Sequence, residues 1–198
     1  MQDANAPDFM ALAAGLLDAV AEAPGVEAAL RQVDRQRRLI APDSIFSIQQ
    51  NVTTAGDPDG EIRLRRFYSS EASRYPVNGV KRKTPSPWTE CLFALGRVFV
   101  GEGESALARS FDDFEQMRVQ GLRRVVNVPL MQGALCFATF NVFGTRAHWL
   151  PQEVLGIRLL ALAAARWVPV HPGLAYSITA FTGCDGTAGA PVASSLEV

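Results

Sequence analysis

Gly121-Leu-Arg-Arg-Val-Val-Asn-Val-Pro-Leu-Met-Gln-Gly133, together with the apolar run that follows it to Asn141, has the pattern of a β-hairpin. The first half alternates apolar and other side chains at the period of two expected for a half-buried strand, through Val126, Val128 and Leu130. The glycine that ends the segment reverses the chain. Residues 135–143 are apolar at both parities, which predicts a central strand covered on both faces.

A second hairpin is predicted upstream. From Ser44 one parity carries Phe46, Ile48, Gln50 and Val52, and the other carries Ser47, Gln49 and Asn51. Asp57-Pro58-Asp59-Gly60 places proline and glycine where a type I turn requires them. Residues 62–69 then read as the returning strand.

Helical spacing is found at both ends of this region. Residues 9–20 and 26–40 each carry apolar side chains at intervals of three and four, and prolines bound both segments. Residues 151–168 form a longer predicted helix that is apolar almost all round. Such a helix must be covered on more than one side, so we expect a homodimer through the first and last helices.

Shorter elements are predicted between the hairpins. Residues 75–87 hold three prolines and a Lys-Arg-Lys run, which indicates a long irregular connection of the kind that often carries function. Residues 88–95 suit a short helix, and residues 97–100 a short strand stopped by Gly101 and Gly103. Residues 106–119 are helical in pattern and end at Gly121.

This order predicts the α/β class, of the α+β type, with an antiparallel sheet and terminal helices packed on one face. We divide the chain into N-terminal helices at 1–42, a sensory domain at 43–168 and a tail at 169–198. The tail gains glycine, alanine, serine and threonine and loses periodicity, so we expect it to be mobile.

Composition excludes several classes of partner. The 198 residues include 19 Lys and Arg against 20 Asp and Glu, so no overall field recruits nucleic acid or an anionic membrane. The three cysteines, Cys91, Cys136 and Cys184, are far apart and encode neither a disulfide framework nor a zinc site. No run approaches the roughly 20 apolar residues that span a bilayer. We therefore expect a cytoplasmic protein with no metal, no resident cofactor, no nucleic-acid partner and no membrane partner.

The element order and the 121–133 segment resemble a GAF domain. In that family a glycine precedes a strand ending in Val-Pro-Leu, a glycine turn follows, and a long helix closes the domain. The chain resembles more narrowly a group of stand-alone bacterial GAF-domain proteins. This closer resemblance rests on Tyr75-Pro-Val-Asn-Gly79-Val-Lys81, Trp88, Phe111-Asp-Asp113, Asn127 and Asn141. The resemblance covers residues 9–168.

The resemblance implies a single sheet with dimerising helices on one side and a ligand cavity on the other. Its customary role is small-molecule sensing in signal transduction. The signature of GAF domains that bind cyclic nucleotides, Asn-Lys followed by Phe and an Asp-Glu pair, is not present in order, so no cyclic nucleotide is expected. Ala138-Thr-Phe-Asn141 stands where Gly-Thr-Leu-Asn is more usual, which changes one wall of the cavity.

We expect this cavity to be lined by Tyr75, Lys81, Trp88, Asp113, Asn127 and Asn141. Aromatic surface would supply affinity, and the lysine and aspartate would orient polar groups. The two strand asparagines need hydrogen-bond partners that a ligand could provide. Each residue also has a structural interpretation: core packing for Trp88, solvation for Lys81, helix capping for Asp113, and bonds to a neighbouring loop for the asparagines.

The sequence identifies no catalytic centre, and two alternatives to a sensor stay open. One is a cysteine-dependent redox enzyme of the free methionine sulfoxide reductase type, a GAF-family enzyme with several cysteines around its cavity. Residues 109–121 supply no cysteine here, and no thiol has an activating base beside it. The other is a protein-interaction scaffold whose pocket has collapsed around large side chains.

Overall fold

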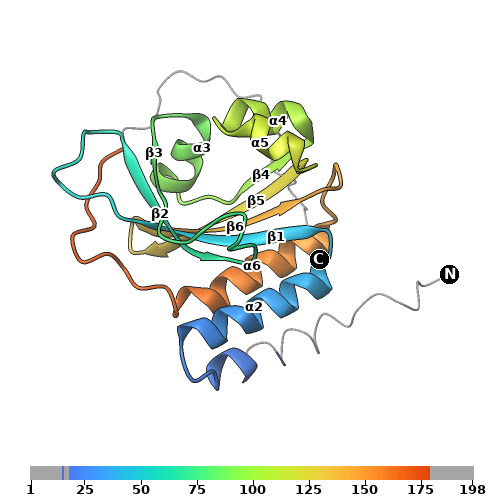
Figure 1. Ribbon diagram of the computed structural model, residues 1–198. Helices are drawn as coiled ribbons and strands as arrows, with labels where there is room; N and C mark the ends of the chain where they lie inside the picture. Colours follow the sequence, from blue (N-terminus) through green and yellow to red (C-terminus); the bar gives the residue numbers. More distant parts are fainter. Residues whose placement is uncertain (1–14, 16–17, 179–198) are drawn as a thin grey trace, which may run out of the picture.

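Six strands form one antiparallel sheet with helices on both faces in the computed structural model, which describes residue 15 and residues 18–178 (Figure 1). The strands are β1 (Ser44–Asn51), β2 (Ile62–Ser69), β3 (Val80–Lys83), β4 (Phe99–Glu102), β5 (Arg124–Gln132) and β6 (Leu135–Gly144). Their order across the sheet is β3-β2-β1-β6-β5-β4. β6 pairs with both β1 and β5, so the predicted central strand and the α+β class are confirmed.

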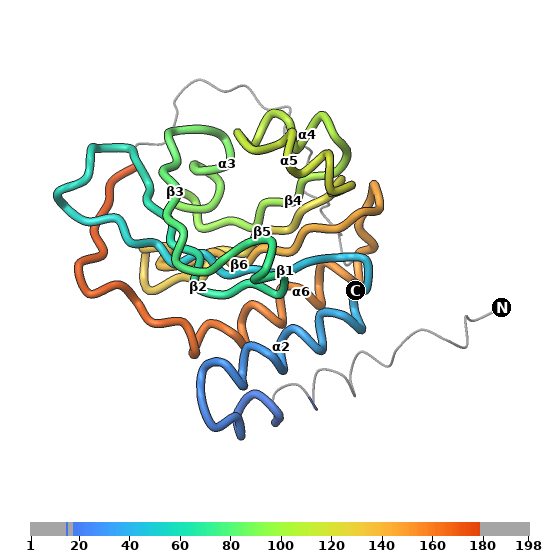
Figure 2. The backbone as a smooth tube through the Cα atoms, in the orientation of Figure 1, coloured from blue at the N-terminus to red at the C-terminus, as the bar shows by residue number. Residues whose placement is uncertain are grey.

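The two faces carry different helices. α2 (Val26–Ile40) and α6 (Pro151–Ala165) lie side by side on one face, as predicted (Figures 1 and 2). The other face is covered by α3 (Pro87–Thr89), the π-helical turn η1 (Glu90–Ala94), α4 (Gly103–Ser110) and α5 (Phe114–Val119). Within the described residues, no helix is long and apolar enough to span a membrane.

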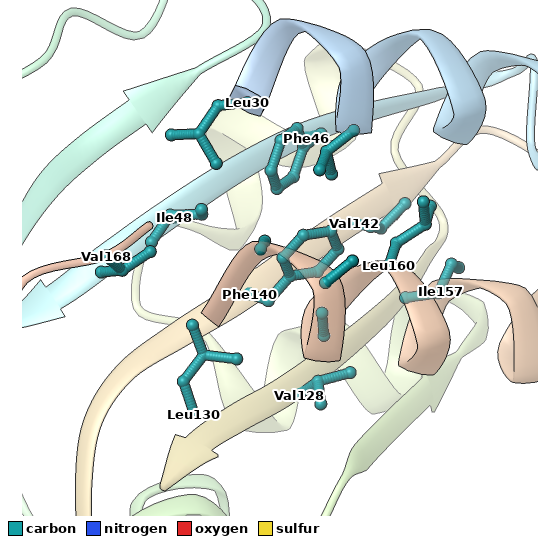
Figure 3. Packing of buried hydrophobic residues seen from close by; sticks show 14 of the residues in the cluster. Leu30, Phe46, Ile48, Val128, Leu130, Phe140, Val142, Ile157, Leu160 and Val168 are labelled. Carbon is teal, nitrogen blue, oxygen red and sulfur yellow. The ribbon is translucent and has the colours of Figure 1, made fainter. Parts of the chain in front are cut away.

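The period of two directs alternate side chains of the central strands into two separate cores. One parity of β1 and β6 meets α2 and α6 in a cluster that includes Leu30, Phe46, Ile48, Phe140, Val142, Ile157 and Leu160 (Figure 3). Burial of each such side chain stabilises the fold by roughly 1.5–3 kcal/mol. The other parity faces α3, α4 and α5, and it forms the floor of the site described below.

Arg124 anchors α6 to the sheet through a buried ion network. Its guanidinium lies 2.5 Å from an oxygen of Asp43 and 2.8 Å from one of Glu153, and it stacks 3.8 Å from the ring centroid of Trp149. The side chain is fully buried, which is tolerated because two carboxylates and a carbonyl meet its charge. Gly144 lies opposite in the ladder, where any Cβ would collide with this arginine.

Several local predictions are wrong. Residues 75–87 are not irregular throughout, because Val80–Lys83 forms the edge strand β3, paired with β2 between the flanking prolines. The strand predicted at 97–100 lies at Phe99–Glu102 instead. Gly101 does not stop it: a Cβ there would come within 2.9 Å of Val125, so the glycine allows β4 to lie close against β5.

The helix predicted at 106–119 is broken into α4 and α5. Phe111 adopts an extended backbone, and its ring enters the second core beside Trp88 and Phe99. Burial of this aromatic surface overrides the local helical pattern. The break places Asp112 and Asp113 in a turn that approaches β3.

The segment after α6 runs along the sheet. Gln50 donates a hydrogen bond to the carbonyl of Pro169, and the Tyr176 hydroxyl accepts one from the backbone N–H of Cys136. The loss of periodicity after residue 168 did not predict these contacts. Residues 179–198 and most of the helix predicted at 9–20 lie outside the described residues, and the division at residues 42 and 168 stays a prediction.

Candidate functional site

A cavity of about 90 Å³ lies between the sheet and the layer formed by α3 and the α4–α5 turn, beside the edge strand β3. Its apolar lining includes Ile45, Leu64, Trp88, Phe111, Met117, Leu122 and Phe143, and its polar lining includes Ser47, Gln49, Arg66, Ser69, Glu71, Lys83 and Thr139. The space suffices for about six to nine water-sized groups. It is smaller than the roughly 300 Å³ at which drug-sized ligand pockets begin.

All six residues predicted for the site line this cavity: Tyr75, Lys81, Trp88, Asp113, Asn127 and Asn141. They come from β3, α3, β5, β6 and two connections, so only the tertiary fold brings them together. Lys81 and Asn141 lie on the same side of the sheet.

The two asparagines already have partners within the protein. Asn127 and Asn141 are paired in the β5–β6 ladder, and the amide of Asn127 donates to the side-chain oxygen of Asn141 over 2.6 Å. The indole N–H of Trp88 donates to the side-chain oxygen of Asn127 over 2.9 Å. The argument that these amides need a ligand is therefore wrong: the network satisfies them and fixes α3 to the sheet.

Lys81 and Asp113 are also paired with each other. The Lys81 ammonium donates a hydrogen bond to the Asp113 carboxylate, and Lys83 reaches Asp112 over 3.1 Å. Burial raises the pKa of Asp113, but the hydrogen bond and charge of Lys81 outweigh burial and lower it below its usual value. The two ion pairs tie β3 to the α4–α5 turn beside the cavity.

Solved structures similar to this chain include GAF domains and phytochrome chromophore-binding domains. The GAF domain of a phosphoenolpyruvate-protein phosphotransferase from Coxiella burnetii matches with a TM-score of 0.60 at 14% identity, over 80% of this chain and 90% of that one. The GAF domain of a sensor histidine kinase from Bacillus halodurans gives 0.52 at 8%, over 69% of this chain and 91% of that one. No protein-family profile and no curated protein matches the sequence.

The chromophore-binding domain of a bacteriophytochrome from R. palustris has a TM-score of 0.56 at 12% identity, over 80% of this chain. The chain spans 60% of that domain. The chain has the fold of a GAF domain. The predicted resemblance is thus confirmed at the level of the fold, with the helical face and the cavity face of the GAF-like domain on opposite sides of its sheet.

Besides the pair formed by Asn127 and Asn141, the sheet carries a second row of polar side chains on the cavity floor, which sequence reasoning missed. Arg66, Gln49 and Thr139 line the cavity from three adjacent strands. Three of their polar atoms, Arg66 Nε, Gln49 Oε1 and Thr139 Oγ1, are buried without a partner among the described residues. The available signal was the polar parity of β1, where Ser47 and Gln49 alternate with the apolar core positions.

Arg66 is held at the cavity by its neighbours. Its guanidinium donates to the carbonyl of Pro76 over 3.2 Å and lies 5.4 Å from the ring centroid of Tyr75. Burial lowers the pKa of this guanidinium, and the nearby charge of Asp113 opposes that change. An arginine stays charged in such surroundings, so Arg66 brings a cation to the wall of the cavity.

The two described cysteines do not line the cavity. Burial raises the pKa of Cys136 to about 12 and also raises the pKa of Cys91. Thiols with raised pKa values are weak nucleophiles. Cys184 lies outside the described residues.

Proposed function

We propose that this GAF-like domain binds a small polar molecule in the cavity and acts as a sensory module. The observation that carries the proposal is a partly open, mostly apolar cavity whose wall holds buried polar atoms without a partner among the described residues. Such atoms destabilise a fold unless a ligand or water meets them. The similar solved structures include a sensor kinase GAF domain and chromophore-binding domains, which favours a sensory role.

The sheet offers a route from ligand to helices. Thr139 faces the cavity, and its neighbour Phe140 belongs to the core shared with α2 and α6. Gln49 and Ile48 have the same relation in β1. A ligand that moves these central strands would alter helix packing, so it would favour one of two helix arrangements by differential binding.

We propose a homodimer as the context for this output. Leu155, Leu159 and Leu162 of α6 are exposed, with exposed fractions of 54%, 39% and 72%, and they recur at helical spacing. A second copy would cover this apolar stripe. Most of the first helix, the other part of the predicted interface, lies outside the described residues.

The test is a thermal-shift screen of a metabolite library against the wild type and two variants of Ser47, which lies on the cavity floor. Ser47→Leu fills the space, whereas Ser47→Ala keeps it open. A ligand of the cavity raises the melting temperature of the wild type and Ser47→Ala but not of Ser47→Leu. A compound that stabilises Ser47→Leu equally binds elsewhere, and a screen without any hit contradicts the proposal.

The small volume of the cavity favours a second candidate, a protein-interaction scaffold with a collapsed pocket. The same screen separates the two, because a scaffold of this kind gives no hit that Ser47→Leu removes.

A further inference from the structure

Three buried polar atoms without a partner in the described part of the chain belong to side chains that form one continuous row on the cavity floor. Gln49 pairs with Arg66 in the β1–β2 ladder and with Thr139 in the β1–β6 ladder. Directly opposed side chains in a sheet have Cβ atoms about 4.5–5.5 Å apart. The three side chains therefore lie next to one another on the floor, and one small molecule that shifts them on entering the cavity can meet Arg66 Nε, Gln49 Oε1 and Thr139 Oγ1 together.

The neighbouring row provides the contrast. Asn127 and Asn141 lie across β5 and β6 on the same face, and their hydrogen bonds with each other and with Trp88 close that row internally. The Asn127–Asn141 row is thus complete, meaning that its members hydrogen-bond within the protein. The row of Arg66, Gln49 and Thr139 is incomplete, because each has a buried polar atom without a partner among the described residues. Thr139 is fully buried, so its unpartnered hydroxyl cannot reach bulk solvent.

The charges around the cavity select an anion at Arg66. Lys81 pairs with Asp113 and Lys83 with Asp112. Within residues 18–178, Arg66 has no ion pair, although it lies close enough to Asp113 for that charge to oppose the lowering of its pKa. Its Nε–H donor and positive charge match a carboxylate oxygen.

The other two atoms define the group beside the anion. The Gln49 oxygen can only accept a hydrogen bond, so it requires a donor on the ligand. The Thr139 hydroxyl both donates and accepts, so it can bridge the carboxylate and that donor.

We propose that the cavity binds a small carboxylate that carries a hydroxyl or amino group on the adjacent carbon. The cavity volume matches a molecule of about the size of lactate or alanine, since about six to nine water-sized groups fit. Glu71, which also lines the cavity, would favour the amino form through its negative charge. This inference rests on the proposed function and gives the ligand its chemical class.

Calorimetric titration with four related compounds tests each element of this match. Lactate and alanine carry both the carboxylate and the donor, propionate lacks the donor, and lactamide lacks the charge. We expect saturable binding of lactate or alanine, weaker binding of propionate, and no binding of lactamide. Equal affinity for lactate and lactamide, or no binding of either lactate or alanine, overturns the proposal.

Matched variants locate the binding. Arg66→Gln should weaken the bound compound roughly 10- to 150-fold, the range for a hydrogen bond to a charged group. Arg65→Gln is the control, because Arg65 is adjacent in β2 but bonds to Gln50 on the other parity of β1. Equal losses in both variants overturn the assignment to Arg66.

Thr139→Val guards against a folding artefact, since it removes the hydroxyl with little change of shape. It should weaken binding while raising the melting temperature of the unliganded protein, and unchanged binding removes Thr139 from the site. The proposed function survives a failure here if the library screen gives another class of compound that Ser47→Leu excludes. The proposed function and this inference both fail if the screen gives no compound whose binding Ser47→Leu removes.

Discussion

Thr139 and Thr53 are both buried, but their hydroxyls differ in hydrogen bonding. Thr53 donates to Asn51 over 2.5 Å and accepts from the backbone N–H of Arg63, whereas the Thr139 hydroxyl has no partner among the described residues. A buried polar group without a partner costs free energy that a valine in its place does not.

We therefore predict opposite stability effects for the same substitution. Thr139→Val should raise the free energy of unfolding by about 1 kcal/mol without ligand, and Thr53→Val should lower it by about 1–3 kcal/mol. Urea denaturation of both variants measures this difference. A loss of stability in Thr139→Val as large as that in Thr53→Val would show that the Thr139 hydroxyl is already satisfied.

Asp43 predicts an acid-dependent loss of stability. Burial raises its pKa, but hydrogen bonds from Arg146 and the charges of Arg124 and Arg146 outweigh burial and lower the pKa from 3.8 to about 2. A lowered pKa in the folded state stabilises the fold above pH 4, and this contribution is lost as the pH falls towards 2.

The contribution should be about 1–2 kcal/mol, allowing for solvent screening around the half-exposed Arg146. Urea unfolding of the wild type and Asp43→Asn from pH 6 to pH 2.5 measures it. The difference in stability between the two proteins should shrink as the pH falls. A constant difference would mean that Asp43 does not titrate in this way.

At the residue scale, the family resemblance and the residue types together predicted six side chains that line the cavity, but they gave several of them the wrong partners. Trp88, Asn127 and Asn141 satisfy one another, and Lys81 pairs with Asp113. These pairings depend on strand register and on the approach of β3 to the α4–α5 turn. Neither is encoded in local pattern.

At the scale of elements, β3 depends on its ion pairs. It is a four-residue strand that, among the described strands, pairs only with β2, and Lys81 and Lys83 link it to Asp113 and Asp112. Half-exposed ion pairs contribute less than about 1 kcal/mol to global stability, yet they can limit local opening.

We predict that Asp113→Asn speeds amide hydrogen exchange in β3 while changing the free energy of unfolding by less than about 1 kcal/mol. Glu115→Gln is the control, because Glu115 pairs with Arg118 within α5 and links nothing to β3. Hydrogen-exchange mass spectrometry of peptides covering Val80–Lys83 gives the result. Equal exchange in the two variants would show that the Lys81–Asp113 pair does not hold the strand.

Elements with strong periodicity were predictable, and short elements governed by distant contacts were not. α2 and the four long strands follow their apolar patterns closely. β3 lies between prolines and has exposed side chains, so it carries no pattern of its own. The break between α4 and α5 arises because the Phe111 ring packs against Trp88 and Phe99.

At the scale of the whole molecule, the two faces of the sheet have different proposed roles. The helical face would join two copies, and the opposite face would hold the ligand. Each face carries an exposed apolar residue that can be mutated to test this division. Leu162 on α6, on the helical face, is 72% exposed, and Val119 on α5, on the cavity face, is 83% exposed.

We predict that Leu162→Glu converts a homodimer to a monomer at micromolar concentration, because a charge would be buried in the apolar stripe. Val119→Glu should leave the dimer intact. Light scattering after size-exclusion chromatography measures both masses. A wild type that stays monomeric on concentration would contradict the proposed assembly.

The central claim, that a ligand meets the incomplete polar row, is tested most directly by the Arg66 side-chain Nε–H signal in nitrogen–proton NMR spectra. Its absence from spectra of Arg66→Gln assigns the signal, which is then followed during titration with lactate and with alanine. We predict that the signal moves saturably with one of these compounds, at the concentration at which binding heat saturates. Saturable binding heat with an unmoved Arg66 signal would contradict the claim, because the ligand would then lie away from Arg66.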